Sequence, residues 1–96
     1  MKKYQIICMG FDGEYKREHP TFETIEDASE SGNDLGSKWF FYPFQFVVSG
    51  ETIRDAGYGL THLEGKRIST VAKIFKKHSE RPDMQGANVE KFWMSL

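Results

Sequence analysis

The sequence has one cysteine, three prolines and no long apolar run. Its single thiol, Cys8, excludes an intramolecular disulfide and favours a reducing compartment. The longest apolar segment, residues 39–48, is interrupted by Pro43 and Gln45, and it is far shorter than the roughly 20 residues of a membrane-spanning helix. The apolar run after Lys2 and Lys3 is too short for a secretion signal. We therefore expect a cytoplasmic protein that does not enter a membrane.

The chain also lacks a charge excess and any catalytic signature. It carries 13 Lys and Arg against 14 Asp and Glu, a net charge of −1, which excludes a histone-like coat for nucleic acid. No cysteine or histidine pair has zinc-site spacing, and Gly-x-Ser-x-Gly is absent. Gly57-Tyr58-Gly59 lacks the spacing of a phosphate-binding loop. We predict no metal, no cofactor and no catalytic residue.

What the sequence does contain indicates one small folded domain over residues 1–96. Hydrophobic residues make up 39% and aromatic residues 15% of the chain, which excludes a disordered tail. A domain of this length buries roughly 60–65% of its unfolded surface. The core is therefore small, and we expect flat faces and shallow grooves in place of a deep pocket.

The first half of the chain predicts a hairpin followed by a helix. Residues 4–11 read as a strand, Asp12-Gly13 as a type I′ turn, and residues 14–19 as a charged edge strand that Pro20 ends. Thr24 is the expected N-cap of a helix that runs to residue 35. Gly32 lies inside this helix, where it costs about 1 kcal/mol relative to Ala. We expect it to allow close approach of another element.

The second half predicts another hairpin and an amphipathic helix. Residues 39–48 read as the principal strand, 49–51 as a turn and 52–55 as its short partner. The second helix begins near Lys66, or before Gly65 if Thr61 and Glu64 form a capping box. Its apolar residues recur at the spacing of one helical face: Ile68, Val71, Ala72 and Phe75.

The resulting order, β-β-α-β-β-α plus a C-terminal tail, predicts an α+β fold. We expect a mixed, mostly antiparallel sheet of about four strands with both helices packed on one face. Residues 82–96 are expected to be a flexible tail or a segment that docks onto the domain.

Charge segregation marks one candidate surface. Residues 1–65 carry a net charge of −5, whereas residues 66–81 carry +5. The cations of this segment fall opposite the apolar face of the second helix, and they form a basic face of Lys66, Arg67, Lys73, Lys76, Lys77 and Arg81. This basic face is either a solvated helix surface or a site for a polyanion or an acidic partner.

Aromatic residues mark a second candidate surface. In the strand at 39–48, alternation places Trp39 and Phe41 on the side opposite Phe44 and Phe46. Exposed rings there would anchor a partner or stack on bases. The alternative is that a C-terminal segment with Phe92 and Trp93 covers them, or that these two rings are anchors themselves.

Three hypotheses for function remain open. The first is a small binding module without catalytic activity, a protein-interaction or regulatory domain that is compatible with a homodimer. The alternative is a nucleic-acid-binding domain that uses the basic second helix. The third is a small enzyme in which one of three histidines meets one of two carboxylates in a cleft, the residues concerned being His19, His62, His78, Asp12 and Asp55.

Overall fold

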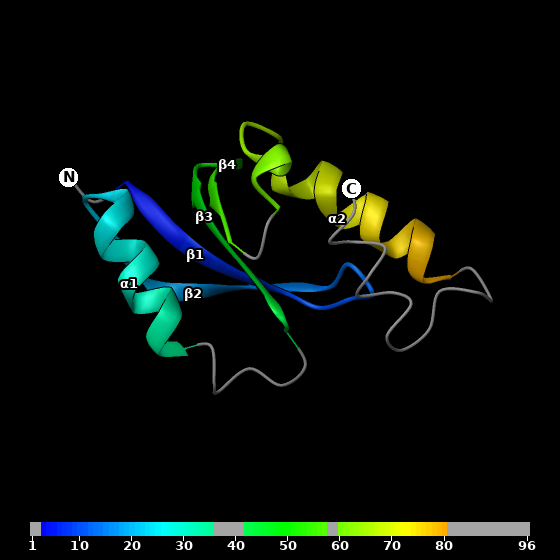
Figure 1. Cartoon of the computed structure of the whole chain (residues 1–96), viewed down its shortest axis with the longest axis horizontal. Helices are drawn as coiled ribbons and strands as arrows, with labels where there is room; N and C mark the ends of the chain where they lie inside the picture. Colours follow the sequence, from blue (N-terminus) through cyan, green and yellow to red (C-terminus); the bar gives the residue numbers. More distant parts are fainter. Residues whose placement is uncertain (1–2, 36–41, 58–59, 81–96) are drawn as a thin grey trace.

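A computed structural model describes residues 3–35, 42–57 and 60–80. Its sheet has four antiparallel strands in the order β2-β1-β3-β4 (Figure 1). The elements, in chain order, are β1 (Tyr4–Met9), β2 (Tyr15–Phe22), α1 (Ile25–Leu35), β3 (Phe44–Ser49), β4 (Thr52–Ala56), the short 3-10 helix η2 (Thr61–Leu63) and α2 (Ile68–Ser79). The predicted α+β class, the four-stranded sheet and the element order are confirmed. The predicted tail at 82–96 lies outside the described residues.

The two helices cover opposite faces of the sheet, so the prediction that both pack on one face is wrong (Figure 1). On β1, Ile7 and Met9 join the core cluster that includes Phe75 of α2. The alternate residues Ile6 and Cys8 join a second cluster with Ala28 of α1. Because successive side chains of a strand point to opposite faces, these clusters lie on the two sides of β1.

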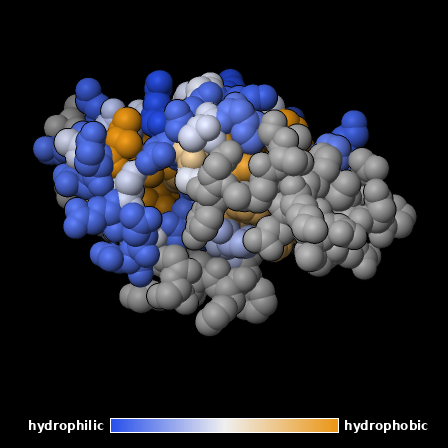
Figure 2. Space-filling view, in the orientation of Figure 1, coloured by the Kyte–Doolittle hydropathy of each residue, from blue (hydrophilic) through white to orange (hydrophobic). Residues whose placement is uncertain are grey.

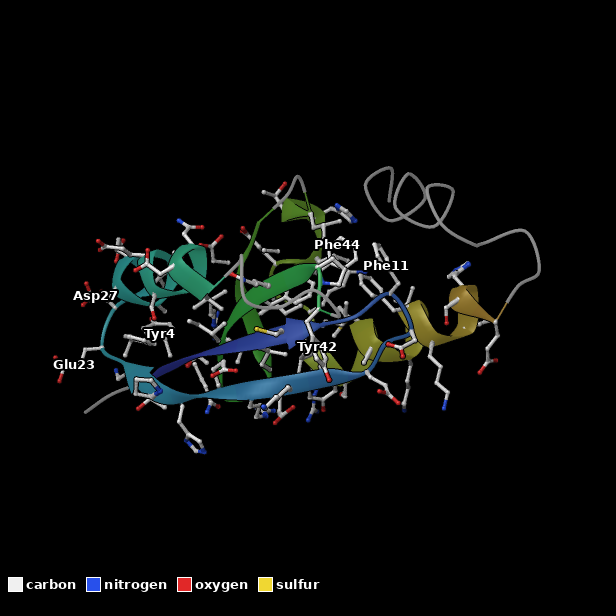
Figure 3. The ribbon with its side chains drawn as sticks, turned by 90° about the horizontal axis from the view of Figure 1, so that it is seen from below. Tyr4, Phe11, Glu23, Asp27, Tyr42 and Phe44 are labelled. Atoms are coloured by element: carbon white, nitrogen blue, oxygen red, sulfur yellow. The ribbon has the colours of Figure 1, made fainter. Side chains whose placement is uncertain are left out.

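The larger core lies between the sheet and α2. The four residues predicted for the apolar face of this helix, Ile68, Val71, Ala72 and Phe75, are all buried. The ring of Phe44 meets those of Phe11 and Phe75 edge-on, with centroids 5.2 and 5.3 Å apart. Phe11 and Phe44 lie at the same end of the sheet in Figure 3. Burial of each such side chain contributes roughly 1.5–3 kcal/mol, so this cluster fixes α2 on the sheet.

Helix α1 begins where the sequence predicts. The backbone N–H of Asp27 donates to Oγ1 of Thr24 over 3.1 Å, which satisfies one free N–H of the first turn. Ala28 is the fully buried contact of this helix with Ile6, Cys8 and Val47 of the sheet.

The alternation predicted for the strand at 39–48 is also confirmed: Phe44, Phe46 and Val48 share the α2 side of β3. That strand begins at Phe44, and the preceding residues 36–41 lie outside the described ranges.

The first hairpin turn differs from the predicted type I′ turn at Asp12-Gly13. The N–H of Gly13 donates to the carbonyl of Gly10, so Phe11 and Asp12 occupy the central positions. Gly13 follows with φ of 82°, as expected for a turn closed by a glycine in the left-handed region. The predicted strand is therefore shorter and ends at Met9. Phe11 packs onto Phe44, a long-range contact that local turn preferences do not include.

Strand β2 lies at the sheet edge, as predicted, but Pro20 does not end it. The strand continues through a cis His19–Pro20 peptide to Phe22. The pairing with β1 shifts between Gln5 and Ile7, and the side chain of Gln5 donates to the carbonyl of Glu18 over 2.8 Å. An irregular edge strand tolerates a proline because its outer N–H has no partner strand.

Candidate functional site: the outer face of α2 and a hollow beside α1

The described part of the basic face lies on and just before α2. Lys66, Arg67, Lys73, Lys76 and Lys77 are all exposed. Lys73 and Lys77 are four residues apart, so they are neighbours on the side of the helix opposite its buried face. Lys76 lies to one side, where its backbone approaches the β1–β2 turn at Gly13. Arg81 lies outside the described residues.

These five cations have no ionic partner within the described ranges. An ion pair does form elsewhere, where the guanidinium of Arg17 donates to the carboxylate of Glu51. No acidic residue lies within α2 itself. Asp12, Glu14 and Glu80 line one surface hollow together with Lys76. Within the described residues, the outer face of α2 is therefore basic mainly at Lys66, Arg67, Lys73 and Lys77.

Backbone hydrogen bonds hold the start of this face against β4. The N–H of Ile53 donates to the carbonyl of Lys66, and the N–H of Ile68 donates to the carbonyl of Glu51, each over 2.8 Å. An isolated antiparallel bridge pairs Thr52 with Arg67. The first two cations therefore extend from backbone that is fixed to the sheet.

The helix dipole explains the cations at only one end of α2. Lys76 and Lys77 lie in the last turn, where positive charge is stabilising. Arg67 is the N-cap, its side chain makes no capping hydrogen bond, and Lys66 directly precedes it. Positive charge beside a helix N-terminus is unfavourable by the same argument. The helix dipole therefore gives no reason for these two cations at this position.

The second surface predicted from the sequence cannot be located among the described residues. Trp39, Phe41, Phe92 and Trp93 all lie outside them. Within the described part, Tyr15 is the only large hydrophobic residue that is exposed, at 38%. The predicted aromatic anchors stay a prediction.

The third hypothesis, a histidine–carboxylate site, gains no support from the described residues. Asp12 accepts the backbone N–H of Glu14 over 3.0 Å. Asp55 accepts the hydroxyl of Ser29 over 2.5 Å, and no histidine is among the described residues around it. Within the same ranges no three His, Cys, Asp or Glu side chains gather as metal ligands would.

A shallow hollow of about 110 Å³ lies between α1 and the β3–β4 hairpin. Figure 2 shows hydrophobic atoms at depth between the hydrophilic surfaces of these two parts. Its described walls are formed from both, by Ile6, Ser29, Gly32, Asn33, Gln45, Phe46, Val47, Asp55 and Gly57. This hollow could not be predicted from local sequence patterns, because its polar pair, Ser29 and Asp55, is separated by 26 positions. Gly32 was the one local signal of it.

Gly32 has the role that its position predicts. A Cβ at this glycine would lie 2.9 Å from Oε1 of Gln45 on β3, closer than nonbonded atoms tolerate. The missing side chain therefore lets the Gln45 amide reach α1. This amide lines the hollow and has no hydrogen-bond partner among the described residues.

Cys8 is a buried structural thiol, as predicted. It is fully buried on β1, beneath α1. Burial raises the pKa of this thiol from 9.0 to about 11, with a further contribution from the negative charge of Glu18. A thiol that stays protonated at neutral pH is a poor nucleophile, so Cys8 is no catalytic candidate.

Comparison with known proteins adds no functional information. No family model, curated protein or solved structure matches this chain. Within the described residues, both helices are too short and too polar to cross a membrane.

Proposed function

We propose that this protein is a cytoplasmic, non-enzymatic binding module that docks an acidic protein through the outer face of α2. The observation that carries the proposal is the pair of exposed cations at the N-terminus of α2, Lys66 and Arg67. They occupy a position where the helix dipole disfavours positive charge. A binding role supplies a reason for their presence that folding does not.

The rest of α2 supports the same proposal. Its buried face fixes the helix on the sheet, and its outer face carries Lys73, Lys76 and Lys77 without ionic partners in the described ranges. An acidic partner would meet a helix held on the sheet, with Lys73 and Lys77 exposed on its outer side. Such complementarity speeds association and sets orientation more than it adds affinity. The binding energy would come from apolar anchors, and Trp39, Phe41, Phe92 and Trp93 keep that predicted role.

A nucleic acid is the alternative polyanion, and the overall charge of the chain favours a protein instead. The whole chain has a net charge of −1 and a pI near 6.3, whereas nucleic-acid-binding domains commonly have a pI above 9.

The proposal is tested by quantitative capture of partners from a lysate of the cells that make the protein. Three tagged forms are compared, with and without nuclease: the natural chain, Lys73→Glu/Lys77→Glu, and the control Lys3→Glu/Arg54→Glu. All four positions are exposed, and both pairs change the net charge equally. Circular dichroism first establishes that each variant is folded.

The expected result is a nuclease-resistant protein that the natural chain and the control retain. We expect Lys73→Glu/Lys77→Glu to lose at least tenfold of it, and higher salt to weaken capture because exposed charges are screened. Equal capture by all three forms would overturn the proposal. Loss of the captured material after nuclease treatment would replace it with the nucleic-acid alternative.

A further inference from the structure

The hollow beside α1 is a second candidate site, independent of the basic face. Its chemistry follows from three polar groups on separate elements. Asp55 of β4 supplies a carboxylate, one oxygen of which accepts from Ser29 of α1. Gln45 of β3 supplies an amide without a hydrogen-bond partner among the described residues, and all three groups line the same hollow.

The charge around the hollow is negative. Asp55 is the only charged residue among its described walls. On α1, Glu26 and Glu30 are exposed and lie three positions before Ser29 and Asn33. Residues three apart are neighbours on a helix surface, so both glutamates lie beside the α1 wall. An anionic ligand is therefore excluded on electrostatic grounds.

The size of the hollow and the apolar residues that line it restrict the class of ligand further. A volume of about 110 Å³ is well below the roughly 300–1,000 Å³ of most small-molecule pockets. The side chains of Ile6 and Val47, which face α1, give the hollow an apolar part. A hard metal ion such as Ca²⁺ takes 6–8 oxygen ligands, and one carboxylate above an apolar floor does not provide them. An alkyl cation matches both parts, since its stem packs on apolar surface while its charged head stays polar.

We propose that this hollow binds a single alkylammonium or guanidinium group. The carboxylate of Asp55 would pair with the cation, the carbonyl of Gln45 would accept a second N–H, and the apolar floor would contact the stem. The cation comes either from a small free amine or from a Lys or Arg side chain of another protein. These sources share one chemistry, and the test separates them.

The test is an NMR titration of the ¹⁵N-labelled full chain. The probes are butylammonium, ethylguanidinium, spermidine, a capped Gly-Gly-Lys-Gly-Gly peptide and its Gln counterpart, with butanol as the uncharged control. We expect saturable shifts at the amides of Ser29, Gly32 and Gln45 with each cation, and none with butanol or the Gln peptide. Tighter binding of the Lys peptide than of butylammonium would indicate a protein side chain, and tighter binding of spermidine a free amine.

Two variants keep the test independent of folding. Asp55→Asn should abolish the shifts, whereas the control Asp34→Asn, at an exposed position of α1, should retain them. Gly32→Ala should weaken binding at least threefold, because its methyl group displaces the Gln45 amide. Because Gly32→Ala also replaces a glycine inside a helix, we expect its melting temperature to be unchanged or higher. Weaker binding by a variant of that stability is not caused by unfolding.

Three results would overturn the proposal. One is the absence of shifts at 20 mM of every cation. Another is binding of the cations by Asp55→Asn as tightly as by the natural chain. The third is saturation of the same amides by Mg²⁺ at lower concentration than by any organic cation. Because none of these readouts involves the α2 face, failure here leaves the proposed docking of an acidic protein untouched.

Discussion

Gly13 is the residue whose replacement the fold should tolerate least. Its φ is 82°, and an added Cβ would lie 2.3 Å from the carbonyl oxygen of Ala72 and 2.8 Å from the backbone nitrogen of Lys76. Both obstacles are backbone atoms of α2, which cannot move without shifting the helix. We expect Gly13→Ala to lower the free energy of unfolding by about 3 kcal/mol or more.

Gly50 provides the matched control for this prediction. It also has a positive φ, 62°, but an added Cβ would meet no atom within 4 Å. Gly50→Ala should therefore cost only the left-handed backbone strain, about 1–2 kcal/mol. Urea unfolding of both variants measures the difference. Equal losses would contradict the packing of the β1–β2 turn against α2.

Cys8 should make the free energy of unfolding depend on pH in the alkaline range. Its pKa rises from 9.0 to about 11 on folding, so the folded state keeps a proton that the unfolded chain releases. This contribution is fully present below pH 9 and is lost as pH rises toward 11. We expect the natural chain to lose more unfolding free energy between pH 8 and 10.5 than Cys8→Ala. Identical slopes for the two proteins would contradict the burial of this thiol.

At the scale of single residues, the sequence predicts local roles better than long-range ones. Thr24 caps α1, and Gly32 allows the close approach of Gln45, as expected. Each role depends on helix position, which the sequence pattern supplies. The Ser29–Asp55 hydrogen bond depends on how α1 is placed over β4. That placement is a tertiary property, so the hollow could not be predicted.

At the scale of the elements, Arg67 at the start of α2 is expected to favour binding but to reduce the stability of the helix. Arg67 has φ of −77° and ψ of 138°, the extended geometry of an N-cap, but its side chain makes no capping hydrogen bond. Asp is among the best N-cap residues and suits the helix dipole. We expect Arg67→Asp to raise the free energy of unfolding by about 1 kcal/mol while it weakens capture of the acidic partner. Arg54→Asp, at an exposed position of β4, should change neither substantially.

The opposite result for Arg67→Asp would count against the proposed function. If the variant captures the partner as well as the natural chain does, the N-terminal cations of α2 have no role in binding. If it destabilises the fold, Arg67 has a structural role, and the electrostatic argument for a binding role fails.

The buried runs of β1 and β3 explain why the prediction that both helices pack on one face of the sheet is wrong. β1 contains four consecutive buried residues, Ile6 to Met9, and β3 contains Phe46, Val47 and Val48 in a row. Continuous apolar runs are typical of strands covered on both faces, whereas alternation is typical of strands covered on one. The runs therefore indicate a sheet between two helices. The amphipathic face of α2, by contrast, was predicted residue by residue.

At the scale of the whole molecule, charge of opposite sign lies on opposite sides of the sheet. The outer face of α2 is basic, and the exposed charges of the α1 segment are all acidic: Glu23, Glu26, Asp27, Glu30 and Asp34. Because the two helices cover opposite faces of the sheet, an acidic partner is attracted to one side and repelled from the other. This arrangement predicts a single binding orientation.

Site-specific photo-crosslinking can show whether an acidic protein docks on the outer face of α2. One benzophenone side chain is placed at Thr70, an exposed residue of α2, and another at Glu30, an exposed residue of α1. If the outer face of α2 docks an acidic protein, we expect a nuclease-resistant crosslink to that protein from position 70 and none from position 30. A protein crosslink from position 30 alone, or a crosslink from position 70 to nucleic acid, would contradict it.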